Sequence, residues 1–434
     1  MVIALIYSII GLRATDAQQR QITLKETIDG AIANSNLLKM NKARVNEAMS
    51  KYDQAKDQSM PTGAVGATYS YAQIPANHIN LGSIDWVLPK SAEAYVGGAS
   101  LNEIIFSGFK LKYARESTNL LAEITQLEAL KNKDLVIYTA IQMYFDLYKT
   151  VQTQKVISQN MAAIDSLVKQ AQQFYEHGIV TQNDILRFKL QLSETAIMAA
   201  DLEANRKIIS YNIVVLLGMP EGTDLMPDTV NLSGDHPGTL QQYRDEAFGN
   251  RQELKQSTLQ ARIDKDFIRS TKADMLPKLS ANVGLNYIHA GADFIPSAGS
   301  FIAPISVGAT VSWNFSSLWF NKNKVSEAHI RQQETFIEKN TISDEIRTEV
   351  SGAYQNYLRT SNKVMLLQVS IDEARENDRM QSDRYRGNVA SVTDRLDAAT
   401  RLYGALTNME LARADAMLAW YTLMKATGKI AQIN

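Results

Sequence analysis

The chain has 434 residues, with 45 Lys and Arg against 46 Asp and Glu, and it contains no Cys. This balance of charge excludes a strongly basic surface for nucleic acid. The absence of thiols excludes disulfides, thiolate metal sites and the acylated cysteine that anchors a lipoprotein. The five histidines include no pair at metal-ligand spacing, so we expect no metal and no other cofactor. A mean hydropathy of −0.21, without an apolar run of about 18 residues, excludes a membrane protein with several helical spans.

The first residues have the pattern of a secretory signal. Residues 2–12 form an apolar run that is too short to cross a bilayer as a helix, and the small-residue cleavage site Thr15-Asp16-Ala17 follows it. We therefore predict a signal peptide over residues 1–17 and export of the remainder. A buried N-terminal segment is the alternative interpretation.

The rest of the chain repeats itself. Residues 90–219 and 305–434 contain no proline, and because proline breaks helix interiors, both stretches are expected to form long helices. A shift of 216 residues aligns 23–61 with 239–277, and a shift of 210 aligns the later parts of the two copies. This self-similarity indicates a tandem duplication. Matches at the second shift include Tyr144/Tyr354, Tyr175/Tyr385, Asp184/Asp394, Leu186/Leu396 and Gly218/Gly428.

Each copy is predicted to contain a helix, a β-hairpin and a long helical hairpin. Apolar side chains at every second position indicate strands, most clearly at Val307, Ala309 and Val311, whereas a nearly sevenfold apolar spacing in the proline-free stretches indicates helices. Strands of about ten residues have the length of a tilted bilayer crossing. The first repeat is predicted at 18–220, with a β-hairpin at about 62–106 and a helical hairpin at about 113–218. A linker follows at 221–237. The second repeat is predicted at 238–434, with a β-hairpin at about 278–316 and a helical hairpin at about 325–428.

Four amphipathic strands cannot close a barrel, since a closed barrel needs about eight. A sheet with open edges also cannot persist in lipid, where every backbone amide must be paired. Several chains must therefore pool their strands, and a hollow oligomer that inserts into a membrane is a conduit. Two other classes remain open at this point: a soluble periplasmic coiled-coil scaffold without transport activity, and a periplasmic enzyme.

The segments Tyr175–Asp184 and Tyr385–Tyr403, together with the order of elements, resemble the TolC family of outer-membrane efflux ducts. Leu216–Pro220 and Ala426–Gly428 are similar to the half-repeat endings of that family. The resemblance implies a mainly α chain with a membrane β-barrel part, in which each chain supplies four strands and long antiparallel helical hairpins. It implies a homotrimer with a twelve-stranded barrel in the outer membrane of a Gram-negative bacterium and an α-helical tunnel in the periplasm. The implied partners are outer-membrane lipid, a periplasmic membrane-fusion adaptor and an inner-membrane pump of the RND, ABC or MFS type.

The resemblance also implies a gate at the periplasmic tips of the helical hairpins. Asp394 and Asp397 match the constriction aspartates, Asp184 the acidic position of the other hairpin, and Tyr385 a tyrosine that holds the gate closed. Helix capping is the alternative role for these carboxylates. Ala390 stands where some members carry a gating arginine, so the resemblance does not imply an Arg–Asp latch in this chain. The turn and adaptor-docking positions are Gly178, Thr181, Gly387 and Ser391.

Aromatic residues near the ends of the strands are predicted to form an interfacial girdle. Ordinary core packing is the alternative. No nucleophile elbow, Walker loop or GxGxxG motif is found, so we expect no enzymatic activity and expect pumping energy to come from a partner. The girdle candidates are Trp313, Phe315, Trp319, Phe320 and Phe106.

Overall fold

The computed structural model of the protein describes residues 19–73, 75, 78–87, 90–228, 238–290 and 301–432. The predicted signal peptide and residues 229–237 of the predicted linker lie outside the described residues. The chain forms two compact units that are each assembled from separate segments. Unit 1 comprises the residues up to Lys42, Glu128–Leu254 and Ile342–Asn434, and unit 2 comprises Ala43–Leu127 and Lys255–Thr341.

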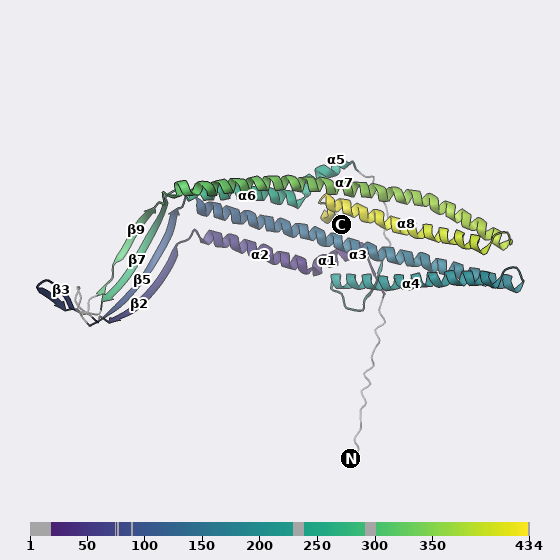
Figure 1. The fold of residues 1–434 in the computed structure, drawn as a ribbon, viewed down its shortest axis with the longest axis horizontal. Helices are drawn as coiled ribbons and strands as arrows, with labels where there is room; N and C mark the ends of the chain where they lie inside the picture. Colours follow the sequence, from purple (N-terminus) through teal and green to yellow (C-terminus); the bar gives the residue numbers. More distant parts are fainter. Residues whose placement is uncertain are drawn as a thin grey trace, which may run out of the picture. The chain divides into compact units, whose positions relative to one another are not determined.

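Helices account for most of the described residues, and the longest ones fall in the two proline-free stretches. Helix α4 folds back along α3, and α8 folds back along α7, as Figure 1 shows. None of the described helices has an apolar stretch long enough to cross a lipid bilayer. The helices are α1 (Leu24–Asn34), α2 (Asn36–Asp57), α3 (Lys110–Glu176), α4 (Gln182–Leu217), α5 (Leu240–Asn250), α6 (Gln252–Ala273), α7 (Ser317–Arg386), α8 (Val392–Ala426) and the 3-10 turn η1 (Ile430–Gln432).

The larger antiparallel sheet of unit 2 has the strand order β2-β5-β7-β9, and the short β8 (Phe301–Ile302) pairs with β7 beside β9. The predicted four long strands per chain and the mainly α composition are confirmed. Each strand begins or ends close to a helix, so both hairpins extend directly from the helical part of the chain (Figure 1). The strands are β2 (Thr62–Gln73), β5 (Ser91–Phe106), β7 (Lys278–Ala290) and β9 (Ile305–Ser312).

Two smaller strand pairs were not anticipated from the sequence. Strands β3 (His78–Leu81) and β4 (Ile84–Val87) form a hairpin between β2 and β5. In unit 1, β1 (Gln19–Ile22) runs parallel to β6 (Asp224–Pro227), so part of the predicted linker is regular structure. Four residues per strand are too few for an alternation pattern to reveal them.

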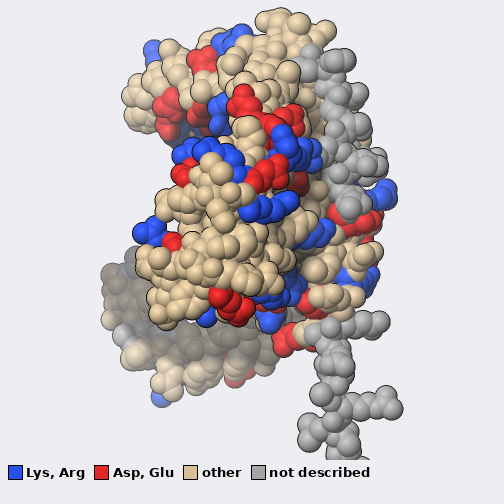
Figure 2. Space-filling view, turned by 90° about the vertical axis from the view of Figure 1, so that its right-hand side faces the viewer, with Lys and Arg blue, Asp and Glu red and all other residues tan. Residues whose placement is uncertain are grey.

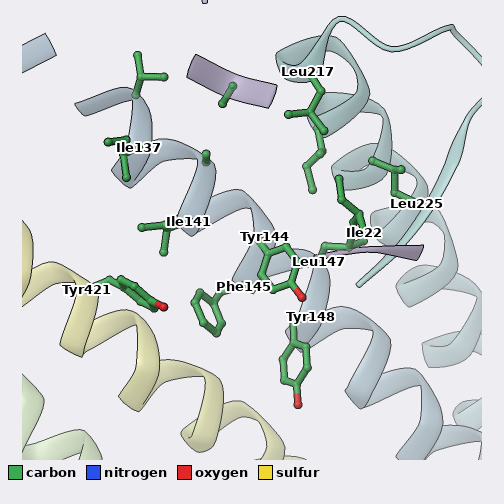
Figure 3. Packing of buried hydrophobic residues seen from close by; sticks show 14 of the residues in the cluster. Ile22, Ile137, Ile141, Tyr144, Phe145, Leu147, Tyr148, Leu217, Leu225 and Tyr421 are labelled. Carbon is green, nitrogen blue, oxygen red and sulfur yellow. The ribbon is translucent and has the colours of Figure 1, made fainter. Parts of the chain in front are cut away.

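The largest apolar cluster of unit 1 holds its helices and the small parallel sheet together. Tyr144, Phe145 and Leu147 of α3 are almost completely buried, as are Ile22 of β1 and Leu225 of β6. Figure 3 shows these side chains turned toward one another, with Tyr421 of α8 facing the ring of Phe145. Side chains of this size each contribute about 1.5–3 kcal/mol when they are fully buried, so this cluster gives unit 1 a core of its own.

Candidate pore gate and membrane face

The helical hairpins of unit 1 turn at two tips with the same backbone geometry. At the α3–α4 tip, the Ile179 amide donates to the Phe174 carbonyl and the Gly178 amide to the Tyr175 carbonyl. This pair of bonds is a Schellman motif, which places a residue with positive φ directly after the helix, and Gly178 has a φ of 74°.

The α7–α8 tip repeats this motif with a different residue at the left-handed position. Val389 donates to the Arg384 carbonyl and Asn388 to the Tyr385 carbonyl. The residue with positive φ is Asn388, at 57°. Asparagine adopts this conformation more readily than most residues other than glycine, and Gly387, a predicted turn position, directly precedes it.

Each tip continues into a helix that begins with a reciprocal capping box. Asp184 Oδ2 accepts from the Thr181 amide at 2.9 Å and from the Thr181 hydroxyl at 2.8 Å. Asp394 Oδ2 accepts from the same groups of Ser391 at 3.1 Å and 2.7 Å. The Ser391 hydroxyl and amide, with a smaller effect of Arg384, lower the pKa of Asp394. Both carboxylates therefore cap helices, and in each case the bonds use only Oδ2.

Asp397 lies three residues beyond Asp394 on α8, and both side chains are exposed. Its Oδ2 is 2.8 Å from Arg401 Nε, one turn further along the helix. Asp394 and Asp397 are thus each accompanied by an arginine, Arg384 and Arg401 respectively. The face in Figure 2 likewise carries positive and negative side chains next to one another.

Tyr385 is enclosed in the protein interior rather than exposed at the tip. Only 3% of the residue is accessible, and its ring packs against Phe174 and Phe188 with centroid separations of 5.7 Å and 6.0 Å. Its hydroxyl has no hydrogen-bond partner among the described residues. Burial, and then the negative charge of Asp184, raise the pKa of Tyr385. This side chain therefore joins the two hairpins within one chain.

Two further contacts at the tips were not predicted from the sequence. Arg187 of α4 donates to the Thr393 hydroxyl of α8 at 2.8 Å, which links the two hairpins. Arg395 is buried and forms an ion pair with Asp378 of α7. The internal repeat held the signal for this pair, because its counterparts 210 residues earlier are the apolar Ile185 and Val168.

The sheet of unit 2 has two chemically different faces. Cross-strand pairs such as Leu101↔Val283 and Val283↔Val307 line up apolar side chains on one face. These residues are exposed, and Val65 on the edge strand β2 is 87% accessible. The carboxylates of this face, Glu93 and Glu103, have register positions near its two ends. The exposed apolar residues between them give the face the properties of a surface that contacts lipid.

The opposite face of the sheet is polar and carries small residues. Asn286 lies over Gly98 and Asn282 over Gly308, so closely that a Cβ on either glycine would come within 3.2 Å of the amide oxygen. The glycines thus leave room for the asparagine amides to lie flat on the sheet. Among the described residues of the four long strands, Lys278 is the one charged residue whose register position is on this face.

Aromatic residues occur at both ends of the apolar face. At the helical end, Phe315 packs edge-on against Trp319, which contacts Phe320, while Phe106 packs against Phe109. The Trp313 indole donates to the Met275 carbonyl at 3.0 Å. At the far end is a second aromatic group that was not predicted from the sequence, in which the rings of Tyr69 and Tyr95 pack against each other at a tilt. The members of this group are Tyr69, Tyr71, Tyr95 and Tyr287.

Comparisons with known proteins agree with this architecture. The curated Outer membrane efflux protein BepC of Brucella suis biovar 1 (strain 1330) is 23% identical over 357 residues, which cover 77% of this chain and 72% of the relative. The outer membrane protein VceC of Vibrio cholerae has a TM-score of 0.79 at 14% identity, with 93% of this chain and 96% of that chain covered. The CmeC outer membrane channel of Campylobacter jejuni has a TM-score of 0.77 at 14% identity, with 94% and 86% covered. These structures share the fold.

A family model matches both halves of the chain. The family model described as outer membrane efflux protein matches residues 27–219 and 243–429, one block in each half of the chain. The two blocks together span most of the sequence and include both helical tips. The resemblance drawn from the sequence is therefore confirmed, and the protein belongs to the outer membrane efflux protein family.

Proposed function

We propose that the protein is the exit duct of a tripartite efflux or type I secretion system and acts as a passive conduit from the periplasm to the exterior. The observation that carries this proposal is the sheet of unit 2, which combines an exposed apolar face with a polar face of small residues. Membership in an efflux family favours the duct over a soluble periplasmic scaffold and gives no support to an enzyme.

The working form is a homotrimer that closes one barrel. Strands β2 and β9 stand at the two edges of the sheet. Unpaired edges cannot remain in lipid, so β9 of one copy pairs with β2 of the next, and three copies supply twelve strands. Exposed apolar residues of α4 in unit 1, among them Leu186, Leu190 and Ile197, are then covered by a neighbouring copy.

The barrel lies in the outer membrane of a Gram-negative bacterium, and the helices form a large periplasmic portion. The aromatic groups at the two ends of the apolar face mark the two lipid interfaces, because amphipathic rings prefer headgroup level. The tips, with Gly178, Thr181, Gly387 and Ser391, dock to a periplasmic adaptor. An inner-membrane pump of the RND, ABC or MFS type supplies the energy.

The gate lies at the tips, where three copies bring six carboxylates of Asp394 and Asp397 together. Because the capping bonds of Asp394 use Oδ2, its Oδ1 is available to face the pore. Asp184 contributes a third acidic position. Tyr385 keeps the gate closed by holding α7 against Phe174 and Phe188, which makes its role one of packing.

Conductance of the purified protein in planar bilayers tests the duct, and block by multivalent cations tests the gate. We expect a detergent-extracted trimer with single-channel conductance, and we expect weaker block after Asp394→Ala with Asp397→Ala. Glu410→Ala is a matched control, since Glu410 lies on the same helix about four turns beyond Asp394 and pairs with Arg413. A soluble monomer without conductance would overturn the duct, and unchanged block would leave the aspartates as helix caps only.

A further inference from the structure

A polar recess lies in unit 2, where β7 begins and β9 runs into α7. It has a volume of about 480 Å³ and is formed by the end of the sheet and the first turns of α7. Its charged residues are Lys278 of β7, Lys324 of α7 and Asp274, which follows α6. The polar residues at its wall are Ser312, Asn314, Ser317 and Asn321.

The recess has an excess of positive charge. The Asp274 carboxylate is 2.8 Å from Lys110 Nζ and is neutralised by that pair. Lys278 and Lys324 form no ion pair with any residue of the described ranges, so two ammonium groups at the recess lack a counterion. Both lysine side chains are exposed, so each can reach a ligand without first breaking an ion pair.

The Asn321 side chain lies beside these lysines. The residue is only 5% accessible, but it lines the recess, and its amide makes no hydrogen bond with the described residues. Its N–H groups and its oxygen are therefore available to a ligand or to water in the recess. The first amides of α7 already donate to the carbonyls of Asn314, Phe315 and Ser316, so the free donors are side chains.

We propose that this recess binds an anionic oxygen group, a phosphate or a carboxylate, through Lys278, Lys324 and the Asn321 amide. Ammonium groups and amide N–H groups donate to such oxygens in charge-assisted hydrogen bonds. The ligand comes either from solutes that pass along the polar face, on which Lys278 lies opposite Ser312, or from a lipid headgroup at the aromatic girdle, to which Trp313 belongs. The choice between these sources rests on the proposed function, whereas the site itself does not.

Titration of inorganic phosphate into the full chain in detergent micelles, followed by calorimetry, tests the site. We expect saturable binding that is weakened by about tenfold or more in Lys278→Gln with Lys324→Gln. Lys322→Gln is the matched control, because it removes the same charge from the same turn of α7 outside the recess, and it should bind as the unaltered protein does. If the double variant does not fold, Lys324→Gln alone changes one exposed side chain and must weaken binding.

Two further measurements identify the source of the ligand. If solutes in the lumen occupy the recess, phosphate shifts the reversal potential in planar bilayers, and the double variant removes the shift. If a headgroup occupies it, native mass spectrometry detects bound phosphatidylglycerol on the unaltered protein and not on the variant. Equal phosphate affinity of the protein and its variant, without lipid retention, would overturn the site. A protein that binds phosphate at this recess but shows no conductance would contradict the proposed duct function and leave the binding site standing.

Discussion

The two helical tips of unit 1 share their backbone and differ in their interior. Both have a Schellman turn and a capping box with an aspartate. At the α3–α4 tip, Val168 and Ile185 are buried in an apolar cluster. At the corresponding positions of the α7–α8 tip, the buried Arg395 forms an ion pair with the partly exposed Asp378. The duplicated framework has thus kept its turns and exchanged an apolar pair for a charged one.

The charged interior leaves the second tip with unsatisfied polar atoms. Gln381 Oε1, Tyr385 Oη and Arg395 Nε are all buried without a hydrogen-bond partner among the described residues. A partly satisfied polar network is less stable than an apolar cluster. We therefore expect the α7–α8 tip to open at a lower free energy than the α3–α4 tip, which agrees with the gate proposed above.

The largest expected effect comes from transferring the apolar pair of the first tip to the second. Arg395→Ile alone removes the cation from the Asp378 carboxylate, whose side chain is 19% accessible, and we expect the opening free energy of the α7–α8 tip to fall by about 1–3 kcal/mol. Asp378→Val with Arg395→Ile reproduces the residues of the first tip and should recover this loss. Hydrogen exchange of the amides in residues 376–386 measures both values.

The control for this cycle is the core of unit 1 away from the tips. Exchange at residues 141–148 should be the same in all variants, because these amides lie in the apolar cluster around Tyr144 and Phe145. A double variant as unstable as Arg395→Ile would show that the ion pair, and not its burial, determines the stability of the tip.

The second largest effect concerns the residue with positive φ in each turn. A Cβ at Gly178 would meet no atom within 4 Å, so Gly178→Ala reports backbone strain alone, and we expect a loss of about 1–2 kcal/mol. Asn388→Gly, at the equivalent position, should stabilise the second tip by a few tenths of a kcal/mol. Thermal unfolding followed by circular dichroism measures the change in stability of both variants. A loss in Asn388→Gly as large as that in Gly178→Ala would show that the two turns are not equivalent.

The sequence predicted the tips in outline because turns and caps are local. Thr181 and Asp184, three residues apart, are enough to indicate a capping box, and the absence of proline is enough to indicate a long helix. The position of Tyr385 could not be predicted, since its counterpart Tyr175 is 48% exposed and the difference arises from packing against α3 and α4. The face of a strand follows from alternation, but the recess at Lys278 depends on how β7, β9 and α7 meet in space.

The third prediction uses these two tyrosines. Tyr385→Phe removes a buried hydroxyl that has no partner, so we expect the second tip to become more stable by about 1 kcal/mol. Tyr175→Phe removes an exposed hydroxyl and should leave the first tip unchanged. Hydrogen exchange of the two tips distinguishes these outcomes. A loss of stability in Tyr385→Phe would show that the hydroxyl is bonded in the assembled protein.

The smallest effect is the response of the second tip to acid. The Ser391 groups and Arg384 lower the pKa of Asp394 below its ordinary value of 3.8. A carboxyl whose pKa is lower in the folded state stabilises that state above its unfolded pKa, and this contribution is lost as the pH falls through the folded pKa. Protection of the first α8 amides, relative to the unfolded-chain rate, should therefore stay constant at neutral pH and decrease only below about pH 4. Asp394→Asn should show no such decrease, because an amide cannot titrate; if the decrease remains, another carboxyl controls the acid opening of this tip.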